Sequence, residues 1–125
     1  MTTRVSIVED DQPTRDALRR IIAGAPELSL VNEYDCSEAA MRGLPGDAPD
    51  VVLTDINLPD RTGVETVRRL KPLMPATQFL MLTVYEDSEH IFAALAAGAT
   101  GYLLKGTRRE ELLAAIAQVV AGGSP

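Results

Sequence analysis

The sequence contains a single cysteine, Cys36, and lacks any run of about 18 apolar residues that could cross a bilayer. One thiol allows no internal disulfide, and the partners that a zinc or redox site would need are missing. The first residues, Met1 to Arg4, also lack the apolar stretch of a signal peptide. We therefore expect a cytoplasmic protein that makes no contact with a membrane.

Basic residues are too few to give the chain an affinity for nucleic acid. The sequence has 12 Lys and Arg against 18 Asp and Glu, and its formal net charge is −6 at pH 7. Binding to phosphate backbones depends on clustered Lys and Arg. We expect this chain to reach DNA only through a further domain. Its 125 residues, 46% of them hydrophobic, are enough for one domain with one core.

Short apolar runs that end at polar residues alternate with stretches of helical spacing along the whole chain. The expected strands are residues 5–8, 28–34, 51–53, 79–82 and 100–104, and the expected helices are residues 13–23, 37–41, 64–70, 88–95 and 107–120. Short connections between them predict a parallel sheet with helices on both faces, because each crossover is right-handed. We predict an α/β, flavodoxin-like (βα)5 fold, doubly wound, with strand order 2-1-3-4-5.

Capping residues predict where several helices begin. Asp11 is expected to be the N-cap of the first helix, and Asp87 or Ser88 that of the fourth. Thr107 and Glu110 have the spacing of a capping box at the start of the last helix.

Glycine and proline predict two breaks in the chain. Ser37 is expected to cap a short helix that ends at Met41, because residues 43–49 are rich in Gly and Pro. The Gly-Gly-Ser-Pro end of the sequence is typical of a linker. We therefore expect one domain over residues 1–121 and the start of a linker at residues 122–125.

Four of the five expected strands end at a reactive polar residue. Glu9 and Asp10 follow the first strand, and Asp55, Thr83 and Lys105 follow the third, fourth and fifth. In an open parallel sheet a site lies beyond the carboxyl ends of the strands, where the strand order reverses. That point falls between the first and third strands, so these side chains are expected to meet there.

The residue types at this edge indicate phosphoryl chemistry. Three clustered carboxylates, Glu9, Asp10 and Asp55, repel one another and require protons or a cation, and their oxygen ligands suit Mg²⁺ better than zinc. A carboxylate beside a bound cation can attack phosphorus to form an acyl phosphate. Lys105 and the Thr83 hydroxyl would stabilise the charge of the transferred group.

The sequence resembles the response regulator receiver domain of two-component signalling over nearly its whole length. The resemblance rests on residues 8–11, 53–63, 82–83 and 101–105. Within that family, residues 82–87 and 98–105 are similar to the FixJ/NarL (LuxR-type) branch.

The resemblance implies a metal site and a phosphoacceptor. Asp55 would accept the phosphoryl group, and Mg²⁺ would be bound by Asp10, Asp55 and the backbone carbonyl of Asn57. Glu9 would act through a metal-bound water.

The resemblance also implies a switch. Thr83 and Lys105 would each bind a phosphoryl oxygen, and Tyr102 would be the aromatic residue whose rotamer reports the state. Two positions depart from the family pattern: Gly106 follows the lysine where most receivers have a proline in a cis bond, and Val84 is bulkier than the usual Ala or Gly.

The expected function is therefore signalling rather than enzymatic turnover. A sensor histidine kinase would be the phosphodonor, and phosphorylation would change the surface of the fourth helix, fifth strand and fifth helix. By resemblance, the output would be transcription through a helix-turn-helix domain absent from this sequence, and the changed surface or that of the first and fifth helices would mediate a weak homodimer.

Three other functions are possible on these residues. The first is a Mg²⁺-dependent phosphohydrolase with an Asp nucleophile; by resemblance to the haloacid dehalogenase family, it would need a second Asp two places later, where Asn57 stands, and a cap domain. A flavin or nucleotide carrier would need a phosphate-binding loop after the first strand, but the acids of residues 9–11 repel phosphate. The third is a receiver-like binding module that is never phosphorylated, against which Asp55, Thr83 and Lys105 argue.

Overall fold

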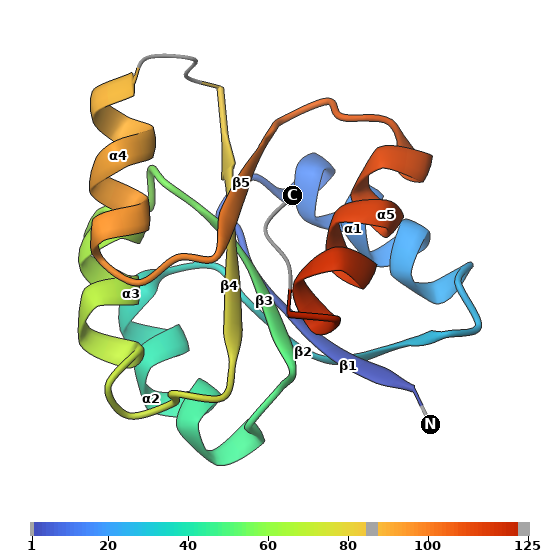
Figure 1. Ribbon diagram of the computed structural model, residues 1–125, viewed down its shortest axis with the longest axis horizontal. Coiled ribbons are helices and arrows are strands. Elements are labelled where there is room, and N and C mark those ends of the chain that lie inside the picture. Colours follow the sequence, from blue (N-terminus) through green and yellow to red (C-terminus); the bar gives the residue numbers. More distant parts are fainter. Residues whose placement is uncertain (1, 85–87, 123–125) are drawn as a thin grey trace.

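Five strands alternate with five helices in the computed structural model, which describes residues 2–84 and 88–122 (Figure 1). The strands are β1 (Thr3–Val8), β2 (Leu28–Tyr34), β3 (Val51–Asp55), β4 (Gln78–Thr83) and β5 (Gly101–Leu104). The helices are α1 (Gln12–Ala23), α2 (Ser37–Asp47), α3 (Gly63–Leu70), α4 (Ser88–Ala96) and α5 (Arg109–Val120). No helix in these two ranges has the length and hydropathy needed to span a membrane.

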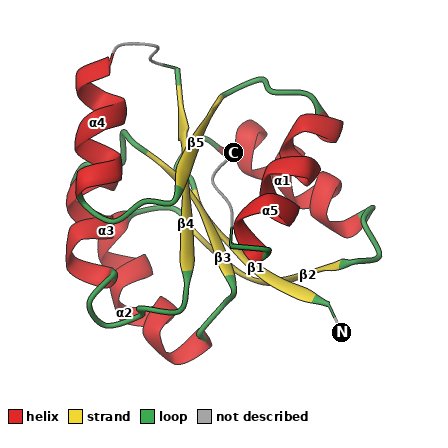
Figure 2. Cartoon of the chain, in the orientation of Figure 1, coloured by secondary structure: helices red, strands yellow, loops and turns green. Residues whose placement is uncertain are grey.

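The strands form one parallel sheet in the order β2-β1-β3-β4-β5. Helices α1 and α5 cover one face, and α2, α3 and α4 cover the other (Figure 2). The predicted (βα)5 flavodoxin-like fold and its strand order are therefore confirmed. The order reverses next to β1, so the ends of β1 and β3 lie side by side at the edge where the site was expected.

The core consists of two apolar layers, one on each face of the sheet. β3 is buried along its whole length because both of its faces are covered. Its residues alternate between the layers: Val52 packs with Phe79 and Met81 under α2 to α4, whereas Leu53 packs with Leu80 under α1 and α5. Both layers hold β3 rigidly and thereby fix the position of its last residue.

The second helix is longer than predicted. α2 continues to Asp47 through Pro45, instead of ending at Met41, and its N-cap is Cys36 rather than Ser37. The continuation is stabilised by Leu44, which is fully buried in the core. Tertiary packing here outweighs the local cost of proline, and the last part of α2 runs in a different direction from its first turns (Figure 1).

The predicted helix starts have mixed outcomes. Asp11 is the N-cap of α1, as predicted, and its side chain accepts a hydrogen bond from Thr14 N. The capping box at the last helix is wrong: α5 begins at Arg109, and the Thr107 hydroxyl instead donates to Leu104 O at 2.5 Å. The proposed cap Asp87 and the last linker residues, 123–125, lie outside the described residues.

Candidate functional site

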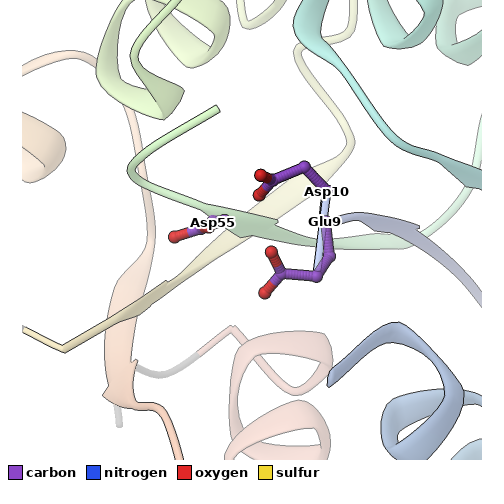
Figure 3. A group of neighbouring side chains, drawn as sticks. All are labelled: Glu9, Asp10 and Asp55. Atoms are coloured by element: carbon purple, nitrogen blue, oxygen red, sulfur yellow. The ribbon is translucent and has the colours of Figure 1, made fainter. Parts of the chain in front are cut away.

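Three acidic side chains meet at the carboxyl ends of β1 and β3. Val8 is the register partner of Thr54, so Glu9 and Asp10, which follow β1, lie beside Asp55, the last residue of β3. One carboxylate oxygen from each acid lies within 4.8 Å of the others. Figure 3 shows Glu9 and Asp10 leaving the turn after β1 in different directions, with Asp55 close to both.

The three acids differ sharply in exposure. Asp10 is exposed, whereas Glu9 has 0% and Asp55 has 4% of its surface accessible. Asp10 is therefore the acid that is open to solvent, while Glu9 forms the buried inner side of the cluster.

Lys105 supplies the positive charge of the cluster. Its Nζ lies 2.9 Å from Glu9 Oε1 and donates a hydrogen bond to Asp55 Oδ2 at 3.0 Å. The lysine directly follows β5, and its backbone N–H donates to Thr83 O at 2.8 Å, which continues the ladder between β4 and β5. Partial burial lowers the pKa of Lys105, but its contacts with Glu9 and Asp55 outweigh that effect and raise the pKa overall.

The buried position of Glu9 makes it a weak acid. Burial, which disfavours the charged carboxylate, raises the pKa of Glu9 to about 7, and the neighbouring Asp55 adds to this rise. The contact with Lys105 opposes the rise without cancelling it. The cluster thus retains a proton more readily than three exposed acids would.

The turn after β1 is held by backbone contacts that sequence reasoning missed. Arg15 on α1 donates from Nη1 to the carbonyl of Glu9 at 2.7 Å, and Asp11 N donates to Glu9 Oε2 at 3.2 Å. A basic residue early in a helix is usually exposed to solvent, and nothing in the local sequence of Arg15 distinguishes it from such a residue. Its contact with Glu9 could therefore not be predicted.

The loop after β3 closes directly over the Asp55 backbone. Asn57 N donates to Asp55 Oδ1 at 3.2 Å, and Asn57 forms an isolated antiparallel bridge with Thr62. Gly63 N donates to Ile56 O at 2.5 Å. A Cβ atom on Gly63 would lie 2.1 Å from Asp55 O, so α3 can begin this close to the acid only with glycine. This places the backbone of Asn57, the expected metal ligand, next to Asp55.

Thr83 and Tyr102 lie on neighbouring strands beside the acids. Asp55 pairs in register with Leu82, and Thr83 follows as the buried last residue of β4. Tyr102 pairs with Met81 across β4 and β5, and its side chain is 40% exposed. Thr83 itself pairs with Leu104, so the exposed Tyr102 and the buried Thr83 lie two positions apart along the paired strands.

Glycine at position 106 is compatible with the lysine contacts. Gly106 adopts φ of 85°, a left-handed conformation closed to proline, whose ring fixes φ near −65°. Lys105 nevertheless reaches both Glu9 and Asp55, so the family's usual proline is not needed to bring the amino group to the acids. Val84, the other departure, is 67% exposed.

A five-stranded parallel sheet of order 2-1-3-4-5 with helices on both faces is the CheY-like receiver fold, and in this chain acids and a lysine meet at its carboxyl edge. The family model for the response regulator receiver domain matches residues 5–117, and the chain belongs to this family. The predicted family is thus confirmed, and this chain is a receiver domain of the two-component response regulators.

The similar curated proteins include a transcriptional activator and a response regulator. The chain is 37% identical over 121 residues to the DNA-binding transcriptional activator DevR/DosR of Mycobacterium tuberculosis, covering 97% of this chain and 56% of that protein. It is 34% identical over 119 residues to the response regulator GacA of Pseudomonas aeruginosa, covering 95% and 56%. The chain thus spans about half the length of these curated relatives.

Solved structures agree on the fold. A two-component response regulator of the LuxR family from Aurantimonas sp. SI85-9A1 is 32% identical, with a TM-score of 0.92, and the match covers 100% of this chain and 91% of that one. A CheY-like receiver domain protein from Methanospirillum hungatei JF-1, 24% identical with a TM-score of 0.89 and coverage of 98% and 96%, shares the fold.

Proposed function

We propose that this receiver domain is a switch operated by phosphorylation of Asp55. The observation that carries the proposal is the contact of Asp55 Oδ2 with Lys105, at a sheet edge where Glu9 and Asp10 lie within reach. The phosphodonor would be the phosphohistidine of a sensor histidine kinase, the class of partner that response regulators have.

The transfer requires little more than positioning and charge stabilisation. A carboxylate oxygen of Asp55 attacks phosphorus, the P–O bond forms as the donor P–N bond breaks, and the departing imidazole takes up a proton. Lys105 and the Thr83 hydroxyl hold two oxygens of the transferred group and stabilise its charge. The product is an acyl phosphate on Asp55.

The acidic cluster fits a magnesium ion. Its donors are carboxylate oxygens, the ligands that Mg²⁺ takes, and one of the three acids is exposed so that an ion has a path to the site. Asp10, Asp55 and the carbonyl of Asn57 would hold the ion, and Glu9 would contact it through water. When bound, it neutralises the carboxylates and the charge of the incoming group.

The output follows from the strands that carry Thr83 and Tyr102. We propose that Thr83 moves toward the phosphoryl group and that Tyr102 turns inward into the space this leaves, which changes the surface of α4, β5 and α5. Residues 1–121 would form the receiver domain, and residues 122–125 would begin a linker to a DNA-binding output domain, in a cytoplasmic transcription regulator.

Membership of the receiver family favours this switch over a phosphohydrolase or an unphosphorylated binding module. In this proposal the phosphodonor is the only substrate. The domain assists its own phosphorylation and dephosphorylation, and it does not catalyse a reaction of other molecules.

Phosphorylation at Asp55 can be tested by intact mass. The chain is incubated with Mg²⁺ and acetyl phosphate, and we expect the mass of one phosphoryl group to be added, and to be lost when EDTA replaces Mg²⁺. Asp55→Asn should add none, because its amide is not a nucleophile. Asp50→Asn, at the opposite edge of the sheet, is the matched control and should be modified as wild type. An adduct that persists in Asp55→Asn would contradict the assignment.

A further inference from the structure

The loop that follows Asp55 is tied to a helix that contributes no side chain to the site. Asp60, at the tip of this loop, accepts hydrogen bonds from two backbone amides at the start of α2: Ser37 N donates to Oδ1 at 2.9 Å, and Glu38 N donates to Oδ2 at 2.8 Å. The first N–H groups of a helix have no partner within the helix, and a carboxylate is a strong acceptor for them. Both oxygens of Asp60 are thereby engaged by a neighbouring element.

A second contact from the same turn of α2 holds α3, at the other end of the loop. The hydroxyls of Ser37 and Thr66 are hydrogen-bonded to each other at 2.6 Å, and both residues are buried. Thr66 lies on α3, whose N-cap is Thr62. The start of α2 therefore fixes both the tip of the loop, through Asp60, and the helix into which the loop leads.

The loop connects these contacts with α2 to the phosphoacceptor, Asp55. Its base is closed by the hydrogen bond from Gly63 N to Ile56 O and by the bridge between Asn57 and Thr62, so its backbone has little freedom to move independently of its tip. Asn57, three positions before Asp60, donates directly to Asp55 Oδ1 at 3.2 Å.

We propose that Asp60 is a positioning residue, which holds the loop so that the backbone carbonyl of Asn57 stays in place for Mg²⁺ beside Asp55. The inference rests on the proposed function, in which that carbonyl is a metal ligand. Groups that orient ligands from outside the coordination sphere commonly change metal affinity by about 10- to 100-fold when removed. Asp60 itself touches neither the acids nor the phosphoryl group in this scheme.

The test compares Mg²⁺ binding by four variants in NMR titrations with MgCl₂ alone. We expect Asp60→Ala to raise the Mg²⁺ dissociation constant about tenfold. Asp60→Asn, which keeps one acceptor oxygen, should fall between Asp60→Ala and wild type. Asp10→Ala is the reference for direct loss of a ligand. Asp50→Ala is the matched control, because Asp50 Oδ2 also accepts a backbone N–H, from Arg4, but at the far edge of the sheet.

The acetyl phosphate reaction gives a second readout, which a merely structural role would not produce. In Asp60→Ala the phosphorylation rate should drop at low Mg²⁺ and recover close to the wild-type rate at saturating Mg²⁺, because every reacting group is still present. Wild-type affinity in both Asp60 variants would overturn the inference and leave the proposed function intact, as would an equal weakening in Asp50→Ala. A wild-type chain that neither binds Mg²⁺ nor is phosphorylated contradicts both proposals.

Discussion

Lys105 is the residue on which the electrostatic balance of the site depends. Its amino group contacts Glu9 and Asp55, two carboxylates that are almost inaccessible to water. Without it, the buried carboxylate of Asp55 would have no cation beside it, and the pKa of Glu9 would rise further because Lys105 would no longer oppose the effect of burial. The same amino group therefore stabilises the resting domain and, in the proposed function, would also stabilise the charge of a transferred phosphoryl group.

Replacement of the lysine should destabilise the domain in Mg²⁺-free buffer. We expect Lys105→Ala to lose about 2 kcal/mol at pH 7, because the buried carboxylate of Asp55 loses its charged hydrogen-bond partner. That loss should lower the melting temperature by about 10 °C, and added Mg²⁺ should restore part of it.

The control is Arg108→Ala, whose side chain is 79% exposed and pairs with Glu111 on the surface. It should change the free energy of unfolding by less than about 0.5 kcal/mol. Thermal melts of Lys105→Ala that match those of wild type would contradict a stabilising role of Lys105 in the resting domain.

Some contacts of single residues could be predicted from the sequence, and others could not. Glu9, Asp10, Asp55 and Lys105 could be expected to meet because each follows a strand, and parallel strands bring their carboxyl ends to one edge. Asp60 lies 23 positions from Ser37, and nothing in its local sequence predicts that contact. The roles of the site residues stay predictions until they are tested.

At the scale of elements, α2 shows why local rules were insufficient. Gly43, Pro45 and Gly46 predicted a loop, but the structure places them within the helix. A Cβ atom on Gly43 would lie 2.2 Å from the Tyr34 hydroxyl, so the glycine allows α2 to pack against β2. The reason for these residues lies in contacts between elements, which periodicity along the chain does not show.

The end of α2 gives a second testable point. Ala48, its C-cap, adopts a left-handed conformation with φ of 46°, which costs a residue with a Cβ about 1–2 kcal/mol. Ala48→Gly should therefore raise the free energy of unfolding by about 0.5–1 kcal/mol, after the greater flexibility of glycine in the unfolded chain is subtracted.

Urea titrations would measure this gain. The matched control is Ala121→Gly at the C-cap of α5, where φ is −76° and no Cβ strain exists to be relieved. That variant should be neutral or less stable than wild type. A loss of stability in Ala48→Gly would contradict the prediction, because it would show that the left-handed conformation of Ala48 does not destabilise the folded domain.

For the molecule as a whole, the apolar surface over α4 and β5 is where we expect phosphorylation to change the contacts that the domain makes. Phe92, Leu95 and Tyr102 expose 73%, 44% and 40% of their surface. α4 and β5 follow β4, which ends at Thr83, so in the proposed switch a displacement of Thr83 would act on the elements that carry this surface. The same surface, or that of α1 and α5, is our proposed contact for a weak homodimer.

NMR with beryllofluoride, a phosphoryl mimic, would test this coupling. We expect chemical-shift changes at Asp55 and Thr83 and also at Tyr102 and along α4. A change from mostly inactive to mostly active requires about 5 kcal/mol of differential stabilisation, which contacts with Lys105, Thr83 and Mg²⁺ can supply. Asp55→Asn with the same reagent is the control. Changes confined to the surroundings of Asp55 would rule out a switch that extends to α4.

The position of β5 as the last strand along the chain also determines when the site is complete during synthesis. Glu9 and Asp10 leave the ribosome early and Asp55 follows, but Lys105 is made some 50 residues later and reaches the acids only after β5 has paired with β4. A nascent chain that ends before β5 would have the three acids near an unpaired β4 edge and no Lys105 to neutralise them. On the proposed mechanism, unfinished chains cannot respond to the kinase, so the signal is received only by molecules whose sheet is complete.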